Sequence, residues 1–220
     1  MGIKKISKLH YITGKRTPEA IIEETKAFLS GGGDWVQLRM KESSDSEMLA
    51  TARIIKGLCR EYGATLIIND RVAIAEQIDA DGVHLGKNDM ETLKARQILG
   101  PDKIIGRTAN TLEDILDILA NGADYIGLGP YRFTTTKKNL SPVLGREGYA
   151  SIFESLQEKG LKTLPTVAIG GITLNDIPLL KDTGISGIAV SGAISADEHP
   201  EETTRSFIEA VAENFKKENL

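Results

Sequence analysis

The chain has 220 residues, of which 40% are hydrophobic and 26% are charged, and its formal net charge is −4. This composition is that of a globular protein, and the acidic balance gives no footprint for nucleic-acid binding. A single cysteine, Cys59, excludes an internal disulfide and suits a reducing compartment. No apolar run approaches the roughly 18 residues of a membrane span, and the first residues lack the apolar region of a signal peptide. We therefore expect a cytoplasmic protein without nucleic-acid or membrane partners.

Apolar runs bounded by turn residues predict eight short strands, and helical spacing or capping residues predict a helix after each. The expected strands are 9–13, 34–39, 65–68, 82–86, 103–106, 125–129, 166–170 and 187–190. The expected helices are 17–30, 46–62, 71–77, 90–99, 111–120, 148–159, 175–181 and 203–215. We expect a longer loop between the sixth strand and Gly148, and we expect it to close over ligands.

The alternation of strands and helices predicts parallel β-α units, and at 220 residues it predicts an α/β fold, a compact (β/α)8 TIM barrel spanning residues 1–220 as one domain. An open doubly wound sheet is the alternative. Two observations favour the barrel. The Gly-x-Gly-x-x-Gly fingerprint is absent after the first strand. A similar turn precedes every second strand, at Asp34, Asp81, Asp124 and Ser186, and alternate strands supply the interior layers of a TIM barrel.

Charged side chains follow the second, third and fourth predicted strands, at the ends where TIM barrels place their active sites. Gln37, Arg39 and Lys41 alternate, so they point the same way. The two cations could pair with a neighbouring strand or bind a polyanion. Asp70 and Asp89 follow adjacent strands, and each could be a helix N-cap. Beside the cations, the two carboxylates favour a Mg²⁺ site shared with phosphate oxygens.

The loops after the later strands suit phosphate. Hydroxyls and cations run from Thr134 to Lys138, which is the composition of a phosphate loop or of a polar surface loop. Gly170-Gly171 and Ser191-Gly192 end the seventh and eighth strands, where backbone N–H groups of TIM barrels often bind phosphate. Tight turns alone would also explain these glycines. Two anion regions predict two phosphorylated substrates, one of them a pyrophosphate. His84 lies inside an apolar strand, so we expect a hydrogen-bonded structural role for it.

Together these residues resemble the thiamine phosphate synthase family over essentially the whole chain. The motifs that carry the resemblance are Gln37-Leu-Arg-Met-Lys41, Ile68-Asn-Asp-Arg71, Asp81-Gly-Val-His-Leu-Gly86 with Asp89, Gly129-Pro130 through Thr136-Lys137, and Gly170-Gly-Ile172. Family enzymes join hydroxymethylpyrimidine pyrophosphate to thiazole phosphate and release pyrophosphate. The resemblance thus implies a transferase of thiamine biosynthesis. It also implies a dissociative mechanism, in which the thiazole nitrogen captures a pyrimidine-methyl cation.

The resemblance also implies roles for single residues. It assigns Arg39, Lys41, Asn69 and Lys137 to the pyrophosphate, with the three cations as catalytic residues, and it assigns Asp70 and Asp89 to Mg²⁺. It assigns Gln37 to the pyrimidine, Thr134, Thr136 and Gly171 to the thiazole phosphate, and Thr108, Ser191 and Gly192 to substrate binding.

The chain departs from the family pattern at a few positions. Thr108 stands where the family commonly has Ser, Asn110 where it has His, Gly192 where it has Ser, and Arg132-Phe133 where it has Phe-Pro. A related thiazole tautomerase is one alternative, although that relative typically lacks the pyrophosphate cations and uses the histidine that Asn110 replaces. A non-catalytic barrel that binds a phosphorylated ligand is another. The sequence is also compatible with a homodimer.

Overall fold

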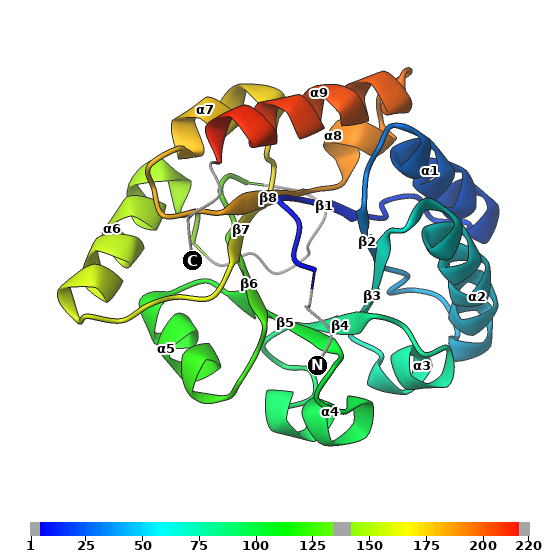
Figure 1. Cartoon of the computed structure of the whole chain (residues 1–220), viewed down its shortest axis with the longest axis horizontal. Helices are drawn as coiled ribbons and strands as arrows, with labels where there is room; N and C mark the ends of the chain where they lie inside the picture. The colour runs from blue at the N-terminus through cyan, green and yellow to red at the C-terminus, as the bar shows by residue number, and fades with distance from the viewer. Residues whose placement is uncertain (1–4, 134–141, 216–220) are drawn as a thin grey trace.

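The computed structural model describes residues 5–133 and 142–215, and in these residues eight strands close into one parallel barrel surrounded by helices (Figure 1). The strands are β1 (Leu9–Ile12), β2 (Trp35–Leu38), β3 (Thr65–Asn69), β4 (Gly82–Leu85), β5 (Ile104–Ala109), β6 (Tyr125–Leu128), β7 (Thr166–Ile169) and β8 (Gly187–Val190). Each strand pairs with its neighbours in chain order, and β8 closes the ring on β1. The prediction of a TIM barrel is confirmed, and the alternative of an open sheet is wrong.

Helices follow the strands in the predicted order. Their bounds are α1 (Pro18–Ser30), α2 (Asp45–Tyr62), α3 (Val72–Gln77), α4 (Thr92–Leu99), α5 (Leu112–Ala120), α6 (Gly145–Glu158), η1 (Leu174–Asp176), α7 (Ile177–Leu180), α8 (Gly192–Ser195) and α9 (Pro200–Asn214). Local capping explains several of the starts. Thr17 accepts from the Ala20 N–H at the start of α1, and Thr111 and Asp114 form a reciprocal capping box at α5.

Two helices begin three residues earlier than the sequence predicts, and one short helix was not predicted. Helix α6 begins at Gly145 and not at Gly148, because the Leu144 and Gly145 N–H groups bond to carbonyls that follow β6. Helix α9 begins at Pro200, where the fixed φ of proline suits a first helical position. The short helix α8 starts directly after Ser191, in a segment that the sequence analysis treated as a turn.

The turn that recurs before every second strand has a common hydrogen-bonding role in three of its four copies. In each, the turn side chain accepts a backbone N–H from the start of the preceding strand. The pairs are Asp81 with Leu66, Asp124 with Ile105 and Ser186 with Thr166, each at 2.8 Å. The fourth copy differs, since Asp34 accepts from the Ser7 hydroxyl at 2.9 Å. In these three copies, the repeated turn therefore supplies a hydrogen bond that holds the amino end of the preceding strand.

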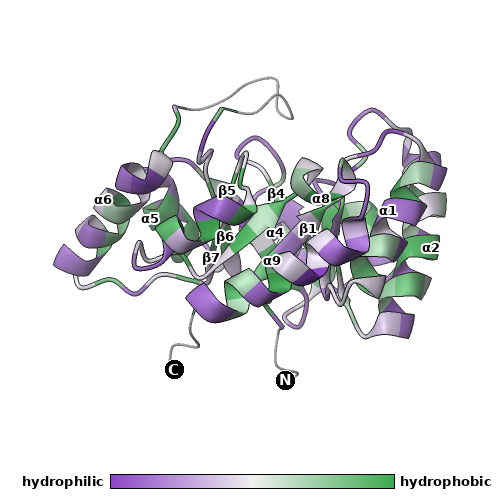
Figure 2. Cartoon of the chain, turned by 90° about the horizontal axis from the view of Figure 1, so that it is seen from above, coloured by the Kyte–Doolittle hydropathy of each residue, from purple (hydrophilic) through white to green (hydrophobic). Residues whose placement is uncertain are grey.

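Two apolar cores hold the barrel. The larger one lies between strands and helices, and it includes Cys59, which is 1% exposed. Burial raises the pKa of this thiol to about 12. The smaller core fills the barrel interior around Trp35 and Tyr125, with His10 stacked on Trp35 at 3.7 Å. Figure 2 shows the same arrangement, with hydrophobic strands inside and hydrophilic bands on the outer faces of the helices. In the described part of the chain, we find no helix that is long and apolar enough to cross a membrane.

Candidate active site

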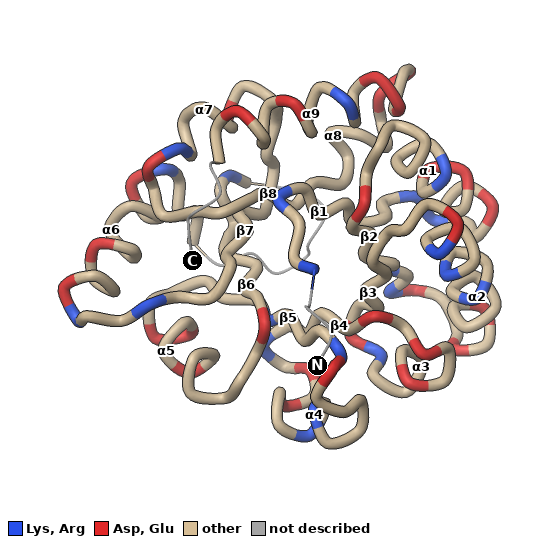
Figure 3. Tube along the Cα trace, viewed as in Figure 1, with Lys and Arg blue, Asp and Glu red and all other residues tan. Residues whose placement is uncertain are grey.

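The charged residues lie mostly on the helices and on the loops at the strand ends, and the strands themselves are largely uncharged (Figure 3). The loops after β2, β3 and β4 contain two of the predicted cations and both predicted carboxylates. The predicted residues Thr134, Thr136 and Lys137 lie outside the described residues.

Strand β2 sets the direction of the first cation. Leu38 and Met40 belong to the larger core, between the strands and the helices. The alternating Gln37 and Arg39 therefore face the barrel axis. Gln37 is 2% exposed, and its amide Nε2 lies 3.5 Å from His10 Nε2. The Arg39 N–H donates to the Thr13 hydroxyl at 2.9 Å, which ties the end of β2 to β1. Burial lowers the pKa of the half-buried Arg39 guanidinium, against the opposing effect of the charges of Asp70 and Glu42.

Lys41 and Asp70 form an ion pair between the loops that follow β2 and β3. Lys41 Nζ lies 3.3 Å from Asp70 Oδ2, and half of the lysine side chain is exposed. The alternative that a strand-two cation pairs with a neighbouring carboxylate therefore describes Lys41 in this structure. An exposed pair of this kind contributes little stability, so the ammonium can turn to a bound anion at low cost.

Neither predicted metal ligand caps a helix. The N-cap residues of α3 and α4 are Arg71 and Glu91, so the capping alternative for Asp70 and Asp89 is wrong. Asp70 instead has a left-handed backbone, with φ 62°, at the centre of a turn closed by the Arg71 N–H on the Asn69 carbonyl at 2.7 Å. Such a conformation is uncommon outside glycine and is frequent at functional sites.

The Asp89 carboxyl lies close enough to Asp70 to perturb the pKa of Asp70. Burial, and then the neighbouring carboxyl of Asp89, raise the pKa of Asp70, and Lys41 acts in the opposite direction. Asp89 Oδ2 also accepts the Gly86 N–H at 2.6 Å, which fixes its carboxylate above the end of β4. Two carboxylates in contact repel unless a proton or a cation lies between them. Their oxygens are the ligand type that Mg²⁺ prefers, with one or two carboxylates per ion. The residues present therefore fit a magnesium ion.

Asn69 is the last residue of β3 and Thr108 is the next to last of β5, and both lie on the side that faces the barrel axis. Ile67 belongs to the smaller core inside the barrel, and Asn69, two residues later on the same strand, faces the same way. Asn69 is 8% exposed. The Thr108 hydroxyl lies 2.9 Å from His84 Nε2, and His84 Nδ1 lies 2.9 Å from the Tyr125 hydroxyl. The prediction that His84 is hydrogen-bonded within the fold is confirmed.

The glycines after β7 are required by the backbone. Gly170 and Gly171 have φ of 102° and 71°, a region that side chains rarely adopt. The Arg132 side chain crosses this turn to reach Asp176, with Nη2 2.5 Å from Oδ1, so a β-carbon at Gly171 would collide with it. After β8, Ser191 is half-buried and Gly192 is exposed at the first position of α8. The N–H groups that begin a helix have no partner within it, so they suit an anion.

Arg71 had no predicted role, although it lies in the motif Ile68–Arg71 that carries the family resemblance. Its guanidinium contacts the Met40 and Ser43 carbonyls at 3.4 and 2.6 Å and the Asp45 carboxylate at 3.1 Å. Arg71 thereby holds the loop that contains Lys41 against the loop that contains Asp70. In the sequence, the one sign of this role was that a cation directly follows two predicted site residues, Asn69 and Asp70.

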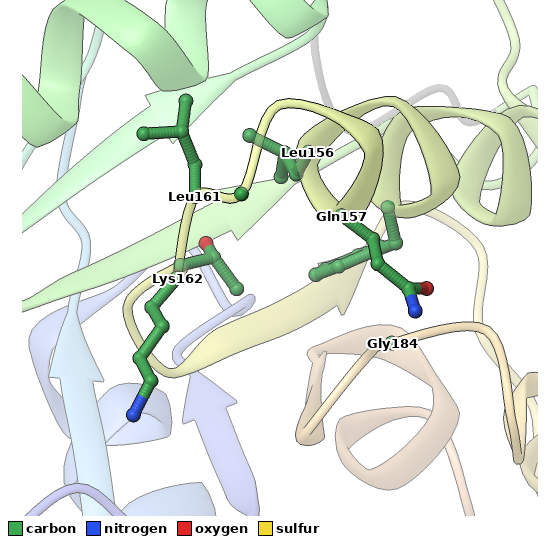
Figure 4. Close-up of a pocket in the computed structure, with 8 residues that line it drawn as sticks. Leu156, Gln157, Leu161, Lys162 and Gly184 are labelled. Carbon is green, nitrogen blue, oxygen red and sulfur yellow. The ribbon is translucent and has the colours of Figure 1, made fainter.

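A separate hollow of ≈ 350 Å³ lies outside the barrel, between the end of α6 and the loop before β8 (Figure 4). Its lining is mainly apolar and includes Phe153, Leu156 and Leu161, with Lys162 as the one charged residue. The lining residues Thr163 and Gly184 precede β7 and β8, so the hollow is at the amino ends of the strands. It is therefore distinct from the site above.

The chain is similar to known proteins over most of its length. The family model described as thiamine monophosphate synthase matches residues 9–194. The chain belongs to this family. A thiamine-phosphate synthase of Bacteroides fragilis is 50% identical over 200 residues, which cover 91% of this chain and 98% of that protein. One of Flavobacterium johnsoniae is 50% identical over 189 residues, or 86% of this chain and 89% of that protein. Among solved structures, thiamine phosphate pyrophosphorylase from Pyrococcus furiosus is 35% identical, with a TM-score of 0.82 and coverage of 95% of this chain and 97% of that chain. The resemblance predicted from sequence is confirmed.

Proposed function

We propose that this chain is a thiamine phosphate synthase. It condenses 4-amino-2-methyl-5-hydroxymethylpyrimidine pyrophosphate with hydroxyethylthiazole phosphate, and it releases pyrophosphate. The observation that carries the proposal is the 50% identity to thiamine-phosphate synthases over nearly the full length of both proteins. The cations and paired carboxylates at the carboxyl ends of β2, β3 and β4 are what a pyrophosphate leaving group needs.

Asp70 and Asp89 would hold a Mg²⁺ ion beside the pyrophosphate. The support is the closeness of two carboxylates that cap no helix, together with the raised pKa of Asp70. When bound, the ion would neutralise negative charge on the phosphate oxygens.

In this proposal the reaction needs no protein nucleophile. The carbon–oxygen bond to pyrophosphate breaks first, and the thiazole nitrogen then adds to the pyrimidine-methyl cation. Arg39, Lys41 and Lys137 would bind the pyrophosphate and stabilise the charge that grows on it during departure. Arg39 suits this role because its partial burial strengthens its interaction with an anion. Asn69 and Thr108 would add hydrogen bonds to the same substrate, and Gln37 would contact the pyrimidine.

The second substrate would bind across the carboxyl ends of β6, β7 and β8. Gly171, Ser191 and Gly192 would present backbone N–H groups to the thiazole phosphate, and Thr134 and Thr136 would add hydroxyls. The left-handed turn at Gly170 and Gly171 supports this assignment, since successive backbone N–H groups in such turns can bind an anion. Holding both substrates in contact would supply much of the rate enhancement.

A thiazole tautomerase is the second candidate, and Asn110 argues against it. That relative uses a histidine at this position to move a proton. Here the Asn110 side-chain amide donates to the Gly129 carbonyl, and an amide does not exchange protons near neutral pH as imidazole does. A non-catalytic phosphate-binding barrel is the third candidate.

One set of incubations separates the three. Pure protein is mixed with Mg²⁺ and either or both substrates, or with a thiazole phosphate tautomer alone, and the products are identified by NMR. A synthase forms thiamine phosphate only when both substrates are present. A tautomerase isomerises a thiazole phosphate tautomer alone, and a binding barrel leaves both substrates unchanged. Either of the last two results would contradict the proposal.

A further inference from the structure

Three hydrogen-bonded side chains, two buried and one half-buried, join the barrel interior to the candidate active site. Tyr125 on β6 contacts His84 on β4, and His84 contacts Thr108 on β5, with both hydrogen bonds at 2.9 Å. The barrel interior leaves space for these side chains. A β-carbon at Gly106 would collide with the Tyr125 ring, and one at Gly127 would lie 3.1 Å from His84 Cε1. Glycines at these two inward positions therefore leave the room that the rings occupy.

The Tyr125 hydroxyl determines where the imidazole proton lies. The phenol is fully buried, and burial raises its pKa well above the usual value, so it keeps its proton. Within residues 5–133 and 142–215, His84 Nδ1 is the one hydrogen-bond partner recorded for that hydroxyl. A buried O–H without an acceptor would cost substantial free energy, so Tyr125 donates to Nδ1. Nδ1 is then unprotonated, and the ring proton is on Nε2.

This tautomer fixes the polarity of Thr108. Nε2–H donates to Thr108 Oγ1, so the threonine hydroxyl acts as an acceptor towards His84. A hydroxyl has a single proton, and that proton now points away from His84. Thr108 is half-buried near the carboxyl end of β5, so the outward direction is the mouth of the barrel. A phosphate oxygen can only accept hydrogen bonds, and it is the natural complement of a hydroxyl oriented in this way.

We propose that His84 is a positioning residue, oriented by Tyr125, that makes Thr108 a hydrogen-bond donor to a pyrophosphate oxygen of the substrate. The opposite tautomer would orient Thr108 as a donor to the ring and present oxygen lone pairs to an anion. Tyr125 thus selects between an attractive and a repulsive contact at the site. The identity of the anion rests on the proposed function, whereas the tautomer does not.

The tautomer is measured in the ligand-free protein by long-range ¹H–¹⁵N NMR, which distinguishes protonated from unprotonated ring nitrogens. The chain has three histidines, and the spectrum of His84→Gln identifies the signals of His84. We expect a protonated Nε2 and an unprotonated Nδ1 at neutral pH. Tyr125→Phe should abolish this preference. A protonated Nδ1 in the wild type would overturn the proposal.

A double-mutant cycle tests the consequence for the substrate. Thr108→Val should lower kcat/KM for the pyrimidine pyrophosphate about ten- to hundredfold, as expected for losing one hydrogen bond to a charged group. Thr108→Ser keeps the hydroxyl and should stay near wild type. Tyr125→Phe should lower kcat/KM in the wild-type background and have little further effect in Thr108→Val, because it acts through Thr108. Equal effects of Tyr125→Phe in both backgrounds would overturn the proposal. A protein that makes no thiamine phosphate but shows the Nε2 tautomer would fail only the proposed function.

Discussion

Asp70 and Asp89 show how single residues in this barrel are placed for chemistry at a cost in stability. The left-handed backbone of Asp70 and the Gly86 hydrogen bond to Asp89 bring two like charges together. Folding raises the pKa of Asp70, so the folded protein binds a proton there more tightly than the unfolded chain does. The contribution of this group to stability is therefore present at low pH and is lost as pH rises through its folded pKa. At neutral pH the ionised pair opposes folding until a cation binds.

Asp70→Asn should therefore raise the melting temperature at pH 7 in the absence of divalent ions. Asparagine tolerates the left-handed backbone well, and the lost ion pair with the half-exposed Lys41 costs little. The gain should shrink as the pH is lowered towards the unfolded pKa of about 3.9. Mg²⁺ should stabilise the wild type more than the variant, because only the wild type keeps both carboxylates. Calorimetry at two pH values with and without Mg²⁺ measures this, and an equal Mg²⁺ shift in both proteins would contradict the metal role of Asp70.

Asp89→Asn separates charge from structure. The asparagine amide oxygen can still accept the Gly86 N–H, so the loop after β4 should keep its shape. The turnover rate should fall by about 10²–10³, a loss typical of removing one electrostatic stabiliser of a transition state. Asp102→Asn is the matched control, since Asp102 is exposed before β5, at the opposite end of the barrel. Steady-state kinetics should show normal turnover for that control. Near-normal turnover of Asp89→Asn at physiological Mg²⁺ would rule out the proposed metal role.

At the scale of elements, the barrel joins neighbouring strands by a side chain in the turn before an even-numbered strand. Asp81, Asp124 and Ser186 each accept a backbone N–H from the preceding odd-numbered strand. The recurrence was visible in the sequence as a repeated turn. Its physical cause was not visible, because the bonded residues are 15 to 20 positions apart.

Asp81→Ala tests this device. The substitution leaves the buried Leu66 N–H without its acceptor, so the free energy of unfolding should fall by ~1–3 kcal/mol. Asp81→Asn keeps an acceptor oxygen and should lose clearly less. Urea denaturation of both variants provides the measurement. An alanine variant as stable as the asparagine variant would show that the bond contributes nothing.

At the scale of the whole molecule, the fold could be predicted because the alternation of apolar runs and capping residues is local. The order of strands and helices follows from that pattern, and barrel closure then gathers the strand ends that contain Arg39, Asp70 and Asp89. Long-range contacts had no such signal. The hydrogen bonds that connect Tyr125, His84 and Thr108 depend on three strands meeting in register. Tyr125 and His84 are 41 positions apart in the sequence. The start of α6 likewise depends on carbonyls that follow β6.

The most direct test of the central claim is the stoichiometry of one reaction. Pure protein is incubated with both substrates, and thiamine phosphate and pyrophosphate are quantified together as Mg²⁺ is varied. We predict equal amounts of the two products, formation that requires both substrates, and loss of both products on chelation of Mg²⁺. Pyrophosphate release without thiamine phosphate, or no product at saturating Mg²⁺, would contradict the assignment of this barrel as a thiamine phosphate synthase.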